Sequence, residues 1–328
     1  MRAVQITELS GPEQALSVDE LPEPEASHML TPGRGVVVEV RAAGVSFPEV
    51  LQTRGQYQVK PPLPFVPGSE VAGIVRSAPD GAPVKAGDRV AAFCMLGGFA
   101  QVAVAPDFFC FALPDRLDFA QGASLVLNYH TAYFALKLRG RLSEGETVLV
   151  HGAAGGVGTA ALQVAKGLGA RTLAVVSTEE KERVAREAGA DEVLRSDGPW
   201  KDQALECSDG GVDLVLDPVG GARFTDSLRS LREGGRVVVV GFTEGSIPEV
   251  RVNRLLLRNT EVIGAGWGAY VLSKPELVRE IGAALDDLIE AGFVTPIVGA
   301  RFPLDRAGEA LSLIDGRGAT GKVVLELS

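Results

Sequence analysis

Residues 148–181 read "VLVHGAAGGVGTAALQVAKGLGARTLAVVSTEEK", and this stretch decides the fold class. An apolar run leads into a glycine-rich turn, a helix-like pattern follows, and a second apolar run ends at Ser177-Thr178. Strand, turn, helix and strand in this order predict a parallel βαβ unit. Gly155 and Gly156 let backbone amides approach a phosphate, and the helix start adds unpaired N–H groups. The turn is therefore expected to hold the pyrophosphate of a dinucleotide, although alanine stands at the first glycine position of G-x-G-x-x-G.

The second apolar run ends without the acidic residue that accepts hydrogen bonds from the ribose of NAD. Ser177 stands there instead, Lys181 follows one helical turn later, and Arg195 closes the next apolar run. A carboxylate would repel a 2'-phosphate, whereas hydroxyls and cations bind one. The pattern favours NADPH over NADH. The alternative reading of Lys181 is a solvated charge on the helix surface.

Three stretches that differ in their residue pattern predict the domains. Residues 1–122 alternate short apolar runs with proline and glycine clusters, which is typical of an all-β region. Residues 123–268 alternate apolar strands with helical patterns, which predicts a parallel sheet covered on both faces. Residues 269–328 contain a helix and a final β run that is expected to return to the first domain. The predicted fold class is α/β.

Charge and cysteine content exclude several kinds of protein. Acidic residues outnumber basic ones 42 to 32, giving a formal charge of -10, so we expect no nucleic-acid partner. The three cysteines have no close paired spacing, which indicates a reducing compartment. The sequence shows neither a signal-peptide pattern nor an apolar stretch long enough to cross a membrane. We therefore expect a cytoplasmic protein without a membrane partner.

Motifs along the whole chain resemble those of the zinc-free quinone oxidoreductases in the medium-chain dehydrogenase/reductase superfamily. They are "GVSFPEVLQTRGQY", "LPFVPGSEVAG", "GDRVAA", "GGFAQ", "LNYHTAY", "LDPVGG", "WGAY" and "ATGKVV". The resemblance implies a GroES-like β-rich catalytic domain made from the N-terminal half and the C-terminal tail. It also implies an inserted Rossmann domain, a cleft that binds NADPH, and a homodimer whose late apolar strands pair across a twofold axis.

The resemblance also assigns roles to individual residues. Tyr57 is the leading hydrogen-bond donor to the substrate, with packing in its loop as the alternative, and Ser46 stands where many relatives have asparagine. His130 is a weaker candidate for proton supply, and core packing is its alternative. The predicted cofactor contacts are Phe47, Thr131, Ala154, Gly155, Gly156, Val157, Ser177, Lys181, Arg195, Phe242, Trp267 and Lys322.

No metal site is expected. Zinc-dependent members of the superfamily carry a cysteine, a His-Glu pair and a lobe of four cysteines. This chain has Ser46, Ser69-Glu70 and only Cys94 at those places. Such a set offers no tetrahedral nitrogen and sulfur site. Without a metal to polarise an ordinary ketone, an acceptor that is already electrophilic is favoured.

The sequence therefore predicts an NADPH-dependent, zinc-independent quinone reductase. A reductase of enones or enoyl thioesters with the same cofactor is the nearest alternative. A noncatalytic protein that binds NADPH or RNA is an alternative of another class, and the acidic charge argues against RNA binding.

Overall fold

The computed structural model describes residues 1–327, and the chain divides into two compact units. Unit 1 contains Met1–Leu127, Pro275–Gly282 and the chain from Pro296 onward. Unit 2 contains Asn128–Lys274 and Ala283–Thr295. The domain boundaries predicted at 122 and 268 stay a prediction.

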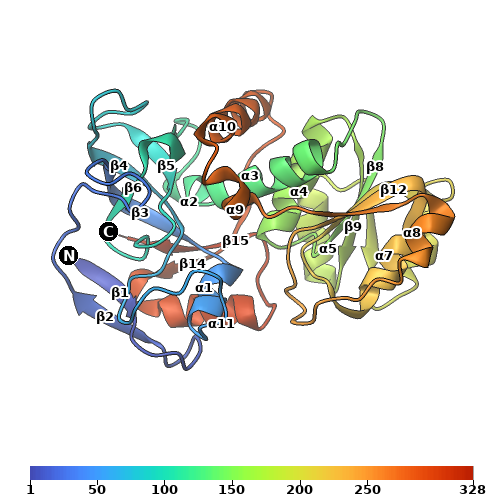
Figure 1. Cartoon of the computed structure of the whole chain (residues 1–328), viewed down its shortest axis with the longest axis horizontal. Helices are drawn as coiled ribbons and strands as arrows, with labels where there is room; N and C mark the ends of the chain where they lie inside the picture. The colour runs from blue at the N-terminus through green and yellow to red at the C-terminus, as the bar shows by residue number, and fades with distance from the viewer. Residues whose placement is uncertain (328) are drawn as a thin grey trace. The chain divides into compact units, whose positions relative to one another are not determined.

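Unit 1 is built around a largely antiparallel seven-stranded sheet (Figure 1). Its strand order is β14-β15-β3-β4-β5-β7, and β6 pairs with β3. The strand β15 near the C-terminus lies antiparallel to β3, so this sheet joins strands from the first third of the chain to its C-terminal part, while β1 and β2 pair in a separate two-stranded sheet. The strands of unit 1 are β1 (Arg2–Ile6), β2 (Leu16–Glu20), β3 (Val36–Val45), β4 (Glu70–Ser77), β5 (Arg89–Phe93), β6 (Val102–Ala105), β7 (Cys110–Ala112), β14 (Val298–Pro303) and β15 (Lys322–Glu326).

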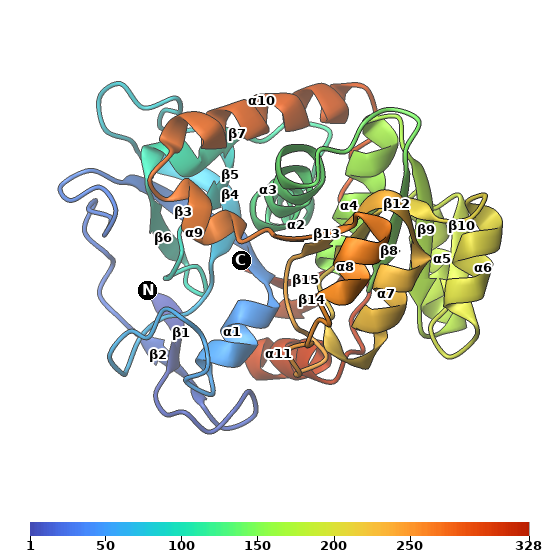
Figure 2. The same cartoon turned by 45° about the vertical axis from the view of Figure 1, so that its right-hand side comes forward.

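Short helices also occur in unit 1, and those before residue 123 correct the expectation that residues 1–122 are all-β. They are α1 (Phe47–Gln52), η1 (Asp107–Phe109), α2 (Phe119–Gly122), η4 (Leu304–Arg306) and α11 (Ala307–Asp315). Helix α1 lies beside α11 (Figure 2). Its start carries the signal S-x-x-E at Ser46 and Glu49, and the Ser46 amide donates to Glu49 Oε2 over 2.9 Å. The proline-rich loop nearby hid this helical turn in the sequence pattern.

Unit 2 contains a six-stranded sheet in which every neighbouring pair is parallel, in the order β10-β9-β8-β11-β12-β13. Numbered along the chain this is 3-2-1-4-5-6, the doubly wound dinucleotide-binding order. The predicted α/β class is confirmed. The strands are β8 (Thr147–His151), β9 (Arg171–Val176), β10 (Glu192–Arg195), β11 (Val212–Asp217), β12 (Leu231–Val239) and β13 (Glu261–Gly264).

From β8 onward, the helices of unit 2 alternate with the strands along the chain (Figures 1 and 2). On one face of the sheet, Leu149 and Val215 pack in a cluster with Trp200 and Phe224. The helices are α3 (Val126–Tyr133), which begins in unit 1, the π-helix η2 (Phe134–Arg139), α4 (Gly156–Gly167), α5 (Glu179–Glu187), α6 (Trp200–Cys207), η3 (Gly221–Arg223), α7 (Phe224–Ser230), α8 (Asn253–Arg258), α9 (Trp267–Val271) and α10 (Pro275–Glu290), which is divided between the units. Within residues 1–327 no helix is both long and apolar enough to cross a membrane.

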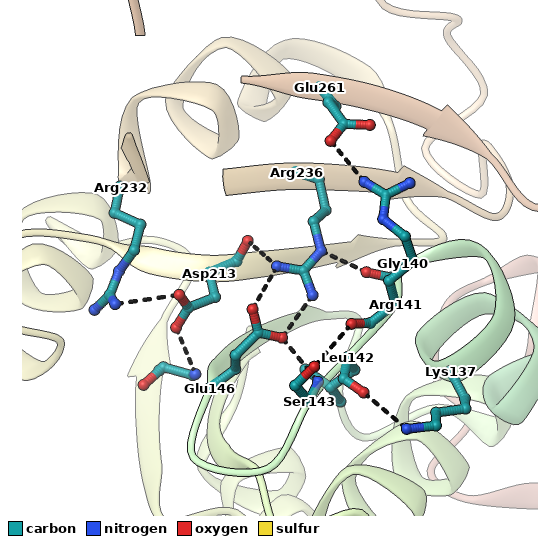
Figure 3. A network of polar contacts seen from close by, with 11 residues as sticks. Lys137, Gly140, Arg141, Leu142, Ser143, Glu146, Asp213, Arg232, Arg236 and Glu261 are labelled. Atoms are coloured by element: carbon teal, nitrogen blue, oxygen red, sulfur yellow. Dashed lines mark hydrogen bonds and ion pairs between the residues drawn. The ribbon is translucent and has the colours of Figure 1, made fainter. Parts of the chain in front are cut away.

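A polar network holds the amino-terminal ends of the parallel strands together (Figure 3). Arg236 on β12 is 6% exposed, and its guanidinium donates to both oxygens of Glu146, over 2.8 and 2.6 Å. It also donates to the backbone carbonyls of Gly140 and Asp213. The Asp213 carboxylate in turn accepts from the amide of Thr147 over 2.8 Å. Because ligands of such sheets bind at the carboxyl ends of the strands, the network lies at the opposite edge.

Candidate active site

The glycine turn joins β8 to α4 in a conformation that side chains would prevent. Gly152 follows β8 with a φ of +57°, and Gly155 caps α4 in an extended conformation. A Cβ atom on Gly158 would lie 2.2 Å from the carbonyl oxygen of Gly152 and 2.6 Å from Cα of Ala153. Both are backbone atoms, which cannot rotate away. The helix start is therefore pressed against the turn, with its free N–H groups beside it.

The turn lies where the strand order reverses, between β8 and β11. The loop after β11 adjoins it, since a Cβ on Gly152 would meet Val219 at 3.2 Å. Asp217 shapes this loop, because its Oδ1 accepts from the amides of Val219 and Gly220 over 2.8 and 2.9 Å. Burial raises the pKa of Asp217. The crevice at such a switch point is the usual dinucleotide site.

Asn128 on α3 also approaches the turn and was not singled out as a site residue. It is 5% exposed, and a Cβ on Gly156 would lie 2.4 Å from its Nδ2. Thr131, one helical turn later and predicted to contact the cofactor, is 8% exposed. The motif "LNYHTAY" contains both residues, but only their common helix shows that they share a face.

Three residues predicted to recognise a 2'-phosphate lie together at the ends of β9 and β10. Lys181 Nζ lies 3.4 Å from the Ser177 hydroxyl oxygen. The Arg195 guanidinium donates to the Ser177 carbonyl over 2.8 Å and contacts Asp197 at 3.2 Å. Thr178 caps α5 by accepting from the Lys181 amide over 3.2 Å, which orients the first turn of that helix. Two cations and a hydroxyl thus lie near one another, and the Asp197 carboxylate shares one of the cations.

Unit 1 contains a buried polar cluster around Ser46. Glu49 and Glu70 are fully buried, and Lys322 is 3% exposed. The Lys322 ammonium donates to Ser46 Oγ over 2.7 Å and forms an ion pair with Glu70 Oε1. The other Glu70 oxygen accepts from the amide of Leu127 over 2.8 Å. Lys322 was predicted to contact the cofactor, and this contact stays a prediction; the structure gives its ammonium two protein partners.

Glu49 forms the other half of the same cluster. Its Oε1 accepts from the Ser69 hydroxyl and its Oε2 from the Ser46 amide. Burial raises the pKa of Glu49, and the Ser69 hydrogen bond and Lys322 oppose the rise. The S-x-x-E spacing was the signal in the sequence, whereas nothing local marked Glu70 as a partner of Lys322.

Tyr57 lies in the loop after α1 and is half-buried. Burial raises the pKa of its phenol, and the charge of Glu49 raises it further. The phenol therefore keeps its proton at neutral pH and is able to donate a hydrogen bond. Ser46 and Phe47 are half-buried as well.

The remaining predicted cofactor residues differ in exposure. Phe242 is 36% exposed and lies over Gly220, whose added Cβ would meet its ring at 2.9 Å. Trp267 is only 2% exposed, and its ring packs edge-on against His130 with centroids 5.6 Å apart. The indole is thus packed in the core of unit 2, and its predicted contact with the cofactor stays a prediction.

The buried histidines are neutral. Burial lowers the pKa of His130 to about 3, so at neutral pH the ring is not the imidazolium that a general acid would need, which argues for its packing role. Burial also lowers the pKa of His151 to about 3, and its Nε2 lies 2.8 Å from the Ser227 hydroxyl. Among residues 1–327 there is no group of three or more His, Cys, Asp or Glu side chains arranged to hold a metal ion.

Two family models match the chain. Residues 32–115 match the alcohol dehydrogenase GroES-like domain, and residues 156–283 match the model described as zinc-binding dehydrogenase. The GroES-like and Rossmann assignments are thereby confirmed.

Curated and solved proteins are similar over the full length. Human quinone oxidoreductase is 36% identical, with 100% of this chain and 98% of that protein covered. A probable oxidoreductase from Mycobacterium abscessus is 43% identical with a TM-score of 0.90, covering 100% of this chain and 99% of that one. The quinone oxidoreductase from Thermus thermophilus, also solved in complex with NADPH, is 36% identical with a TM-score of 0.84 and complete coverage of both chains. The chain therefore belongs to the quinone oxidoreductase family of the medium-chain dehydrogenase/reductase superfamily.

Proposed function

We propose that this protein is a cytoplasmic NADPH-dependent oxidoreductase that reduces quinones without zinc. The observation that carries the proposal is the pairing of the glycine turn with Ser177, Lys181 and Arg195 at the same edge of the unit 2 sheet. The full-length likeness to quinone oxidoreductases, one of them solved with NADPH, supports it.

The residues of unit 2 fit the cofactor. The amides at Gly155 and Gly156, with the neighbouring Ala154 and Val157, receive the pyrophosphate at the start of α4. Ser177, Lys181 and Arg195 receive the 2'-phosphate. Thr131, Phe47 and Phe242 are further proposed contacts. When bound, NADPH supplies a hydride.

Neutral donors in unit 1 orient the acceptor. Tyr57 keeps its proton, and Ser46 is held by Lys322. As a quinone or enone is reduced, negative charge grows on its carbonyl oxygen, and hydrogen bonds from such donors stabilise it. An alcohol or simple ketone needs stronger polarisation, which zinc supplies in other enzymes. The proposal of zinc independence rests on the donor set of Ser46, Ser69 and Glu70, which contains neither histidine nor cysteine.

A substrate panel tests the function. Purified protein should oxidise NADPH with para-quinones faster than with enones or enoyl thioesters, and dialysis against a strong chelator should leave turnover unchanged. Fastest turnover of an enone or a thioester would instead assign the alternative double-bond reductase. Stoichiometric zinc whose removal abolishes activity would contradict the zinc-free proposal. No turnover together with tight RNA retention at low salt would favour the noncatalytic alternative.

Cofactor selectivity should depend on Lys181 and Ser177. Lys181→Ala should weaken NADPH binding by about 1.5 to 3 kcal/mol, the size of a charge-assisted hydrogen bond, and leave NADH binding nearly unchanged. Selectivity then falls about 10- to 100-fold. Ser177→Asp should lower it further, because a carboxylate repels the phosphate and accepts from the NADH ribose. Fluorescence titration of both cofactors measures these effects.

Lys166→Ala is the matched control, since this lysine pairs with Asp191 on the same sheet unit and lies outside the proposed phosphate group. If Lys181→Ala weakened the binding of NADH and NADPH equally, Lys181 would be a solvated charge on the helix surface.

We also propose a homodimer formed at the β13 edge of the unit 2 sheet. β13 is the last strand of that sheet, and exposed apolar side chains precede it. These are Ile247 (75% exposed), Val252 (72%), Leu256 (77%) and Leu257 (76%). Light scattering should give twice the monomer mass, and Leu257→Asp should shift the population to monomer, because it buries a charge in the interface. Met29→Asp, at a 59% exposed site of unit 1, should leave the dimer intact. A wild type that is monomeric at micromolar concentration would refute the proposal.

A further inference from the structure

We propose that Lys322 is a positioning residue that makes Ser46 the hydrogen-bond donor to the oxygen of the reduced acceptor. The inference rests on the proposed function and adds a role for a buried ammonium. The lysine acts through the serine hydroxyl and does not contact the substrate.

Hydrogen-bond direction is the first step of the argument. Lys322 Nζ lies 2.7 Å from Ser46 Oγ, and an ammonium has three donors and no acceptor. Ser46 Oγ must therefore accept from Lys322, which leaves its hydroxyl hydrogen for another partner. Within residues 1–327 no protein group accepts that hydrogen. Ser46 is half-buried and Lys322 is 3% exposed, so the serine is the more exposed of the two residues.

The second step is that the ammonium is fixed in place. Glu70 is fully buried, pairs with Lys322 through one oxygen and accepts from the Leu127 amide through the other, over 2.8 Å. Both carboxylate oxygens thus have partners, and the pair has little freedom to reorient. A cation behind a hydroxyl polarises the O–H bond, and a low local dielectric strengthens this effect.

A comparison inside the cluster separates Ser46 from Ser69. The Ser69 hydroxyl donates to Glu49 and is 6% exposed, so its hydrogen is already used. Ser46 donates to the Glu49 carboxylate through its backbone amide, over 2.9 Å, and not through its hydroxyl. Of these two serine hydroxyls, only that of Ser46 accepts from a cation and still has its own hydrogen available to donate. This matches the need for a donor at an oxygen that gains negative charge.

The experiment measures turnover with a series of para-benzoquinones whose substituents range from electron-withdrawing to electron-donating. Ser46→Ala should lower kcat about 10- to 100-fold and leave the NADPH dissociation constant within about twofold. The loss should be larger for electron-rich quinones, whose reduced oxygen carries more localised charge. Ser46→Thr keeps the hydroxyl and should restore most of the rate. A merely structural role for Ser46 would lower kcat equally across the series.

The coupling to Lys322 is tested with the double variant Lys322→Met/Glu70→Gln, which removes both buried charges together. This double variant should lower kcat by about the same factor as Ser46→Ala. When it is combined with Ser46→Ala, kcat should fall by less than about a further twofold. Lys166→Met removes an exposed lysine paired with Asp191 and should leave kcat unchanged.

Two results would overturn the inference. One is a kcat for Ser46→Ala that lies within about twofold of the wild-type kcat across the quinone series. This measurement uses no lysine variant, so it does not depend on whether such a variant folds. The other is that Lys322→Met/Glu70→Gln lowers kcat by the same factor in the wild type and in Ser46→Ala, because Lys322 would then act independently of Ser46. A wild type that fails to oxidise NADPH with any quinone would instead contradict the proposed function.

Discussion

Replacing Arg236 by methionine should lower the free energy of unfolding by about 3 to 5 kcal/mol, the usual cost of removing one partner from a buried ion pair. The loss leaves Glu146, which is 25% exposed, without its two charged hydrogen bonds. It also leaves the carbonyls of Gly140 and Asp213 without a donor (Figure 3). Urea unfolding followed by fluorescence and calorimetry measures the change.

Two controls make the Arg236 result specific. Arg301→Met removes an arginine that is 43% exposed and paired with exposed carboxylates, and it should cost no more than about 1 kcal/mol. Arg236→Met/Glu146→Met should recover much of the loss, because the unpaired buried charge is gone. NADPH affinity should stay within about twofold in all three variants, since the network lies at the sheet edge opposite the glycine turn. A loss below about 1 kcal/mol for Arg236→Met would mean that water replaces its bonds.

Gly158→Ala should have the largest effect on cofactor binding of any single methyl group added to the chain. The new Cβ would lie 2.2 Å from the Gly152 carbonyl oxygen, so α4 has to move away from the turn. Such overpacking costs about 1 to 3 kcal/mol of stability. Each charge-assisted bond from the turn to the pyrophosphate that is lost raises the NADPH dissociation constant about 10- to 100-fold.

Gly268→Ala is the control for this substitution, because a Cβ at that helical glycine meets nothing within 4 Å. It should leave affinity unchanged and raise stability by up to about 1 kcal/mol. Titration of NADPH with the three proteins decides the matter. Unchanged affinity in a folded Gly158→Ala protein would show that the turn does not hold the phosphates.

Local sequence chemistry predicted the features that depend on neighbouring residues. The βαβ unit, the parallel sheet and the convergence of Ser177 with Lys181 follow from strand and helix periodicity within one short stretch. The glycine turn belongs to the same class, because only a residue without Cβ fits at Gly158. Helix α1 carried a local signal as well, at Ser46 and Glu49, but prolines in the neighbouring loop masked it.

Tertiary structure decided the features that join distant parts of the chain. Lys322 and Glu70 lie 252 positions apart in sequence, and they meet because β15 pairs with β3, which also pairs with β4. Trp267 is a core residue because its aromatic area is buried against His130. Residue type and spacing along the chain determined which groups can bind a dinucleotide phosphate. Strand pairing and burial, which bring together residues that no local pattern relates, determined which hydroxyl has its hydrogen free.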